Sequence, residues 1–142
     1  LLFLNGISGL GSPYWRSHFE SRFVGDGDGG ARFAALVASI AYLVRENFNA
    51  LRGAGPIARA IVTGGLSQSN GLVQLIADLC GIPLLRPKDS EATARGVFGL
   101  LIRARAPAPP DGESQSFEPG ATMQADAGHR RWRDAMLQAL AS

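Results

Sequence analysis

The chain has 142 residues, of which 46% are hydrophobic and 18% charged, and its formal net charge is +2. This length and composition allow a buried core, which excludes an intrinsically disordered protein and favours one globular domain. The basic residues are spread along the chain, so no nucleic-acid partner is expected. No apolar run reaches the ~20 residues of a membrane span, and no signal peptide is recognisable. We therefore expect a soluble, cytoplasmic protein without a membrane partner.

The first third of the chain predicts a strand, a glycine-rich loop and a long helix. Residues 1–4 form an apolar run that ends at Asn5 and Gly6, which indicates a strand followed by a loop. Residues 25–30, GDGDGG, predict a turn, because glycines lose much backbone entropy in regular structure. Apolar residues then recur every three or four positions as one helical stripe, which ends near Gly53. The stripe consists of Phe33, Val37, Ile40, Val44, Phe48 and Leu51.

A strand, a tight turn and a second helix follow. Residues 59–63 contain a β-branched run and predict a short buried strand that ends at Gly64 and Gly65. Ser67 or Ser69 then suits the N-cap of a helix. Gly81 has the position of a left-handed residue that ends this helix.

The remaining third predicts one more strand and two helices. Residues 82–85 predict a strand, and a helix from Ser90 and Glu91 ends near Arg103 and Arg105, whose charges suit a helix C-terminus. Residues 104–116 predict a linker or surface loop. Residues 125–140 predict a closing amphipathic helix.

The order of these elements predicts an α/β fold with parallel strands and crossover helices. The strands at 59–63 and 82–85 should pair in parallel and leave an unpaired edge, which favours self-association. Ligands of such sheets bind beyond the carboxyl ends of the strands, where the turn at Gly64 and Gly65 lies. Paired glycines let a backbone approach a ligand, and a helix N-terminus presents free N–H groups to an anion. Spacing alone leaves open whether these glycines bind phosphate or only form the turn, because neither GxGxxG nor GxxxxGK[ST] is present.

Few other residues suggest chemistry. The two histidines, His18 and His129, are far apart and no CxxC or HExxH motif occurs, so no metal site is predicted. His18 is interpreted as a loop residue. His129 belongs to a basic cluster around Trp132 that is interpreted as the solvated face of a helix. The single cysteine, Cys80, is interpreted as a small core residue.

Four segments, in order, resemble motifs of the FGGY family of carbohydrate kinases. GLGSPYW at residues 9–15 is similar to a loop of glycerol kinases, and VTGGLSQS at residues 62–69 resembles the glycine motif on the family's nucleotide side. The family's RP…E…A stretch resembles Arg86-Pro87 with Glu91, Ala94, Gly96 and Gly99. Its closing FEP matches Phe117, Glu118 and Pro119. The resemblance covers about residues 3–120.

The resemblance implies a partial actin-like, ribonuclease H-like ATPase domain: strand, helix, strand, helix, strand, helix and a C-terminal helix. Residues 1–142 would be the nucleotide-side, C-terminal domain, without the sugar-binding N-terminal domain, the catalytic aspartate and the first strands of this domain. The implied reaction transfers the γ-phosphoryl group of ATP, accompanied by Mg²⁺, to a sugar or polyol hydroxyl. The implied nucleotide contacts are Gly64, Gly65, Ser69 and Asn70.

Three positions depart from the family pattern. Arg16 stands where an aspartate usually follows the tryptophan, and Ala38 stands where a glutamate is frequent. Thr63 replaces the aspartate of glycerol kinases, as it often does in xylulose kinases, so glycerol-like and pentulose-like substrates both stay open. A non-catalytic, kinase-derived binding or assembly module also stays open. A dinucleotide-binding Rossmann domain is disfavoured, because residues 84–86 offer no acidic group for a ribose.

Overall fold

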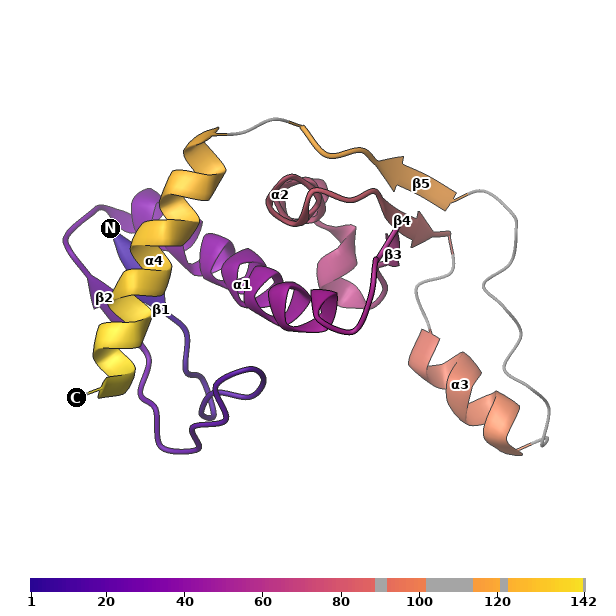
Figure 1. The fold of residues 1–142 in the computed structure, drawn as a ribbon, viewed down its shortest axis with the longest axis horizontal. Helices are drawn as coiled ribbons and strands as arrows, with labels where there is room; N and C mark the ends of the chain where they lie inside the picture. Colours follow the sequence, from indigo (N-terminus) through magenta and orange to yellow (C-terminus); the bar gives the residue numbers. More distant parts are fainter. Residues whose placement is uncertain (89–91, 102–113, 121–122, 142) are drawn as a thin grey trace.

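The computed structural model describes residues 1–88, 92–101, 114–120 and 123–141. They form the expected mixed α/β fold (Figure 1). Its elements in chain order are β1 (Leu2–Leu4), β2 (Arg22–Val24), α1 (Gly29–Arg52), β3 (Ala60–Ile61), the 3₁₀ helix η1 (Gly65–Gln68), α2 (Asn70–Cys80), β4 (Leu84–Pro87), α3 (Ala92–Leu101), β5 (Ser114–Phe117) and α4 (Met123–Ala141). Within this part of the chain, no helix combines the length and apolar character that crossing a membrane requires.

The first sheet is a two-stranded antiparallel pair. The predicted strand at residues 1–4 is confirmed as β1, and it pairs with β2 in the register Leu2↔Val24 and Leu4↔Arg22. The Phe3 and Phe23 rings lie 4.8 Å apart between centroids. Strand β2 was not predicted from the sequence, because three exposed residues after an irregular loop carry no periodic signal.

Helix α1 begins earlier than the glycine-rich segment predicts. The Asp28 side chain accepts a hydrogen bond from the Ala31 N–H at 2.8 Å, so Asp28 is the N-cap. The predicted turn is therefore wrong for Gly29 and Gly30, which form the first turn of the helix. An N-cap of this kind contributes roughly 1 kcal/mol, which offsets part of the entropic cost of the two glycines. The predicted end is confirmed, with Gly53 as the C-cap.

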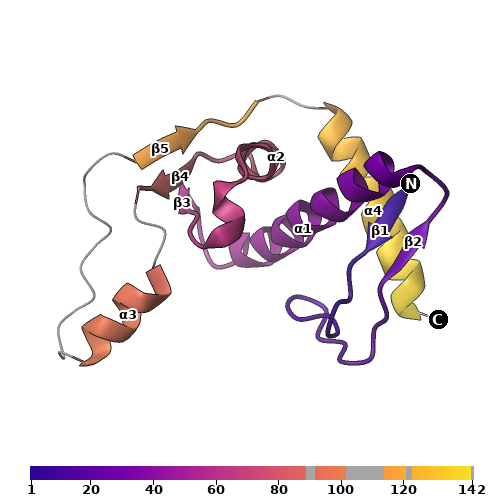
Figure 2. The ribbon, with the colours of Figure 1, turned by 180° about the vertical axis from the view of Figure 1, so that it is seen from behind.

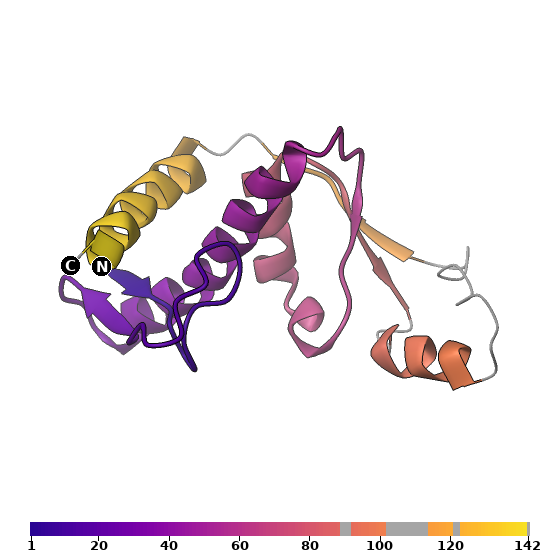
Figure 3. The ribbon, with the colours of Figure 1, turned by 60° about the horizontal axis from the view of Figure 1, so that its bottom comes forward.

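The buried side of α1 differs from the predicted stripe. Phe33 and Leu51 are 69% and 59% exposed, whereas the polar residues Ser39 and Glu46 are buried together with Ala41, Tyr42 and Phe48. The cause is tertiary: α1 packs against β1, α2 and α4 and lies between them (Figure 3). A helix with apolar residues on more than one side can bury either side, and its neighbours decide which one.

The second sheet has the order β3-β4-β5. Strands β3 and β4 are parallel, as predicted, with Ala60↔Leu84 and Ile61↔Leu85 as partners, and β3 lies at an edge. Strand β5 is antiparallel to β4. The predicted loop at residues 104–116 is therefore wrong for Ser114–Ser116, while residues 104–113 lie outside the described residues. A polar strand with only Phe117 buried shows no alternation that would have revealed it.

The core lies between α1, α2, α4 and the two sheets (Figure 2). Helix α2 begins after Ser69, which is its N-cap and one of the two caps predicted from the sequence. The helix ends at Gly81, whose φ of 66° confirms the predicted left-handed conformation. Cys80 is buried in the core, as predicted. The closing helix is confirmed as α4, and its Trp132 is fully buried and donates from Nε1 to the Phe3 carbonyl at 2.8 Å.

Helix α3 stands apart from the packed core (Figures 1 and 3). It confirms a third helix at Ala92–Leu101. The predicted start at Ser90 and Glu91 and the predicted end at Arg103 and Arg105 lie outside the described residues. Its large apolar side chains are exposed: Val97, Phe98, Leu100 and Leu101.

Candidate functional site

The candidate site is the turn that joins β3 to α2 through η1. Gly64 has a φ of 85°, a conformation that favours glycine, and it is the N-cap of the 3₁₀ helix. Its carbonyl accepts two hydrogen bonds from Ser67, from the N–H at 3.1 Å and from Oγ at 2.7 Å. Gly64 is thus explained by the geometry of the turn.

Gly65 has no such explanation. Its φ lies outside the left-handed range, and a Cβ added there would meet no atom within 4 Å. Throughout the part of the chain that the structure describes, nothing accepts a hydrogen bond from the N–H of Gly65 or Leu66. Gly65 therefore presents open backbone to the outside of the turn, where an approaching group would be restricted by any side chain.

Ser69 and Asn70 complete the predicted set. Ser69 Oγ accepts a hydrogen bond from the Leu72 N–H at 3.4 Å as the N-cap of α2. Asn70 is the first residue of that helix, and its side chain is exposed. The structure thus brings all four predicted residues together in one strand-to-helix turn.

Arg86 on β4 also contacts this turn, which was not predicted from the sequence. From β4, its Nη1 donates to the Ser67 carbonyl at 2.6 Å, and its Nη2 donates to Asn70 Oδ1 at 2.8 Å and to Gln115 Oε1. One signal was available: Arg86 lies near the carboxyl end of β4, which is parallel to β3, and the carboxyl ends of parallel strands meet at one edge of a sheet.

An apolar groove of about 350 Å³ borders the turn. Ile61 and Leu66 line it and are largely exposed, although both are apolar. The other lining residues are Ile40, Val44, Val62, Thr63, Ser67, Leu72, Val73 and Ile76. Contiguous exposed apolar surface of this kind is typical of contact sites.

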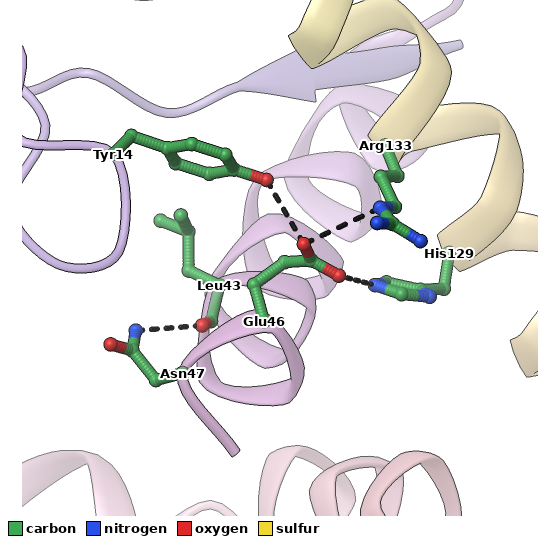
Figure 4. A network of polar contacts seen from close by, with 6 residues as sticks. All are labelled: Tyr14, Leu43, Glu46, Asn47, His129 and Arg133. Carbon is green, nitrogen blue, oxygen red and sulfur yellow. Dashed lines mark hydrogen bonds and ion pairs between the residues drawn. The ribbon is translucent and has the colours of Figure 1, made fainter. Parts of the chain in front are cut away.

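A second polar cluster surrounds Glu46 on α1 (Figure 4). This carboxylate is 9% exposed and accepts a hydrogen bond from the Tyr14 hydroxyl at 3.2 Å. His129 Nε2 lies 2.8 Å from Oε1, and Arg133 Nε lies 3.5 Å from Oε2. The cluster joins the GLGSPYW loop, α1 and α4. The prediction that His129 lies on a solvated helix face was wrong, because it is 7% exposed against Glu46.

Burial controls the protonation states in this cluster. Burial lowers the pKa of His129, against the opposing effect of Glu46, so the neutral imidazole donates its Nε2 proton to the carboxylate. Burial, followed by the Glu46 charge, raises the pKa of the Tyr14 hydroxyl, which stays a donor. The partners of Glu46 come from the GLGSPYW loop and from α4, so the cluster fixes these two elements against α1.

The remaining points raised by the sequence are the role of His18 and metal binding. His18 lies exposed in the loop before β2, in agreement with its interpretation as a loop residue. No group of three or more histidines, cysteines, aspartates and glutamates gathers within the described ranges.

Comparison with protein families gives a match over most of the chain. Residues 1–105 match the family model described as "FGGY family of carbohydrate kinases, C-terminal domain". A glycerol kinase of Acaryochloris marina is 33% identical over 156 residues, which cover 96% of this chain and 30% of that protein. A glycerol kinase of Trichodesmium erythraeum is 38% identical over 108 residues, covering 70% of this chain and 21% of that protein. The chain thus spans less than a third of the length of these relatives.

Solved structures agree on the fold. A xylulose kinase of Brucella ovis matches with a TM-score of 0.78 at 22% identity. The match covers 99% of this chain and 32% of that kinase. Plasmodium falciparum glycerol kinase with ADP has a TM-score of 0.74 at 20% identity, with 98% and 30% covered. The expected partial actin-like, ribonuclease H-like fold is confirmed. The matched family model, together with the strand, glycine turn and helix that the motif predicts, shows that this chain belongs to the FGGY family of carbohydrate kinases.

Proposed function

We propose that the chain is the nucleotide-side, C-terminal part of a carbohydrate kinase that transfers the γ-phosphoryl group of ATP to a sugar or polyol hydroxyl. Gly65 is the observation that carries this proposal. The turn itself explains Gly64, but neither backbone conformation nor packing in the described residues explains Gly65. A glycine beside unpaired N–H groups at the carboxyl end of a strand suits the close approach of a phosphate.

Each of the four turn residues has a role in this proposal. The diphosphate end of the nucleotide lies over Gly64 and Gly65 and accepts hydrogen bonds from the N–H groups of Gly65 and Leu66. Ser69 or Asn70 faces the ribose or base. Mg²⁺ bound with ATP neutralises phosphate charge, and the residues of the turn bind and orient the nucleotide.

The proposed reaction needs more than this chain. From the resemblance we expect the catalytic aspartate and most of the sugar-binding residues to lie outside these 142 residues. Phosphoryl transfer depends almost entirely on positioning and electrostatic stabilisation, so half a cleft should give nearly no rate. We expect no ATP-dependent phosphorylation of glycerol or xylulose by the purified 142-residue chain. Turnover of either substrate by the chain alone would contradict this division of labour.

The nucleotide site is tested by making Gly65→Val in the full-length natural protein that contains this sequence. The valine side chain would occupy the space of the phosphates, and we expect ATP affinity, measured by titration calorimetry, to fall about tenfold or more. Gly29→Val is the matched control, because a Cβ at Gly29 also meets no atom within 4 Å but lies at the start of α1. If the two variants have equal ATP affinity at equal folded fraction, the turn does not bind the nucleotide and its glycines serve only the backbone geometry.

The free edge of β3 supports the second candidate function, a non-catalytic binding or assembly module. Ile61 on this edge is 49% exposed and lines the apolar groove. An unpaired edge beside apolar surface favours pairing with another strand, including self-association. Sedimentation velocity over a range of concentrations tests this, and a concentration-independent monomer would contradict self-association.

A further inference from the structure

We propose that Arg86 is a positioning residue of the nucleotide site, which orients Asn70 so that its side-chain NH₂ faces the nucleoside. The proposal rests on the nucleotide function proposed above and adds a residue and a hydrogen-bonding requirement to it. The ligand must offer an acceptor, such as a purine ring nitrogen or a ribose oxygen, to the amide of Asn70.

The guanidinium of Arg86 connects three parts of the fold. It reaches from β4 to the Ser67 carbonyl at the end of the turn and to Asn70 at the start of α2. It also donates to Gln115 on β5 and lies 5.1 Å from the centre of the Phe117 ring. A planar group with five N–H donors can hold several acceptors in a fixed geometry, which a lysine cannot do.

This geometry determines which way the Asn70 carboxamide points. Arginine is a donor only, so the atom of Asn70 that faces Arg86 must be the oxygen. The NH₂ group of Asn70 is then directed away from Arg86, and the residue is exposed. A freely rotating asparagine would present its oxygen and its nitrogen in turn, whereas this one presents a donor.

Arg86 also restrains the turn that carries Gly65. Within the described residues, Ser67 is tied to Gly64 on one side and to Arg86 on the other. The open N–H groups of Gly65 and Leu66 therefore lie on a segment that is anchored to the sheet. A site held in its binding conformation loses less entropy when a ligand binds, so loss of the anchor should weaken binding.

The chain offers a matched control in Arg52. Its Nη2 donates to the Cys80 carbonyl at 2.9 Å, and its guanidinium lies 5.1 Å from the centre of the Phe48 ring. Arg52 thus makes the same kinds of contact as Arg86, but at the opposite end of α2. Replacing either arginine removes a carbonyl contact and a ring contact, and only replacing Arg86 frees Asn70.

The experiment compares Arg86→Met with Arg52→Met in the full-length natural protein. We expect Arg86→Met to weaken ADP affinity about tenfold and Arg52→Met to change it less than about twofold, at equal folded fraction. Arg86→Lys restores the charge but not the planar fork, so it should stay close to Arg86→Met. It also serves as the test if the methionine variant does not fold.

A double-mutant cycle with Asn70→Ala tests whether Arg86 acts through Asn70. If it does, Arg86→Met weakens ADP binding much less in the Asn70→Ala background than in the wild type. Additive effects would overturn the orientation of Asn70 by Arg86 and leave only the anchoring of the turn through Ser67. Wild-type ADP affinity in Arg86→Met and Arg86→Lys would overturn the positioning role altogether. If the proposed nucleotide site itself is wrong, Gly65→Val also retains wild-type ADP affinity. If only the role of Arg86 is wrong, Gly65→Val still weakens ADP binding while the Arg86 variants do not.

Discussion

The two ends of the molecule differ in how completely their groups are satisfied. Around α4, the buried carboxylate of Glu46 has three partners and Trp132 is fully enclosed. Around β3, an apolar edge residue and a groove are exposed, and the N–H groups of Gly65 and Leu66 have no acceptor among the described residues. Among the described residues, Arg45 Nε beside this cluster is the one buried side-chain nitrogen or oxygen without a hydrogen-bond partner. The contacts of Glu46 and Trp132 indicate that the α4 end holds elements of the fold together, whereas the exposed N–H groups and apolar surface indicate that the β3 end can receive a ligand or a strand.

The largest expected effect is at Trp132. Trp132→Ala leaves a cavity between β1 and α4 and removes the donor to the Phe3 carbonyl. We expect a loss of about 3–5 kcal/mol in the free energy of unfolding of the 142-residue chain, measured by urea denaturation. Trp15→Ala is the control, because Trp15 is 74% exposed, and surface substitutions usually stay within about 0.5 kcal/mol. Similar losses in both variants would contradict the assignment of Trp132 to the buried core.

The second-largest expected effect on stability is at Glu46. Glu46→Ala leaves the Tyr14 hydroxyl and His129 without their acceptor and removes one of the hydrogen bonds between the GLGSPYW loop and α1, while the Asn47 side chain still donates to the Ser12 carbonyl. We expect a loss of about 1–3 kcal/mol in the free energy of unfolding, because buried donors are left unpaired. Glu20→Ala, on the exposed loop, is the control and should have little effect. A Glu46→Ala variant as stable as wild type would show that the cluster is dispensable.

The same cluster predicts a pH dependence. Burial lowers the pKa of His129 below its ordinary value of 6.5, with Arg45 and Arg133 acting in the same direction and Glu46 opposing. The unfolded chain then binds this proton more readily than the folded chain, so stability is present above pH 6.5 and is lost as the pH falls below it. His129→Gln should reduce this loss in urea denaturation between pH 7.5 and 5, whereas His18→Gln should not. An identical pH profile in His129→Gln would contradict the assignment.

The fold was predictable where local signals agree with the tertiary structure. The cap at Ser69 and the left-handed Gly81 each specify their own conformation, and the structure confirms them. The β-branched run before Gly64 does form a strand, but only at Ala60–Ile61, and the prediction that it is buried was wrong, because β3 lies at a sheet edge and Ile61 is 49% exposed. The buried side of α1 was not predictable, because β1, α2 and α4 select it and Glu46 becomes buried only through Tyr14 and His129. Strand β5 depends wholly on its pairing with β4.

The backbone turn of the candidate site could be predicted from the sequence, but the side-chain contacts of Arg86 that hold the turn could not. The paired glycines and the helix start specify a turn from sequence alone, and the four residues do come together there. The contact between Arg86 and Asn70 joins residues 16 positions apart and exists only because β3 and β4 are parallel neighbours. No periodicity within either segment contains that information. Whether the turn binds a nucleotide stays a prediction.

The smallest expected effect on stability lies at the open end. Ile61→Thr keeps a β-branched residue on β3 and removes apolar surface that is already half exposed. We expect the free energy of unfolding to change by less than about 0.5 kcal/mol, in contrast to the losses at Trp132 and Glu46. The effect should appear in association instead, because the threonine makes the edge beside the groove more polar. Sedimentation velocity should show fewer large species for Ile61→Thr than for the wild-type chain at the same concentration. A large loss of stability without any change in association would mean that Ile61 supports the fold of this chain, and that the β3 end is not the receiving side of the molecule.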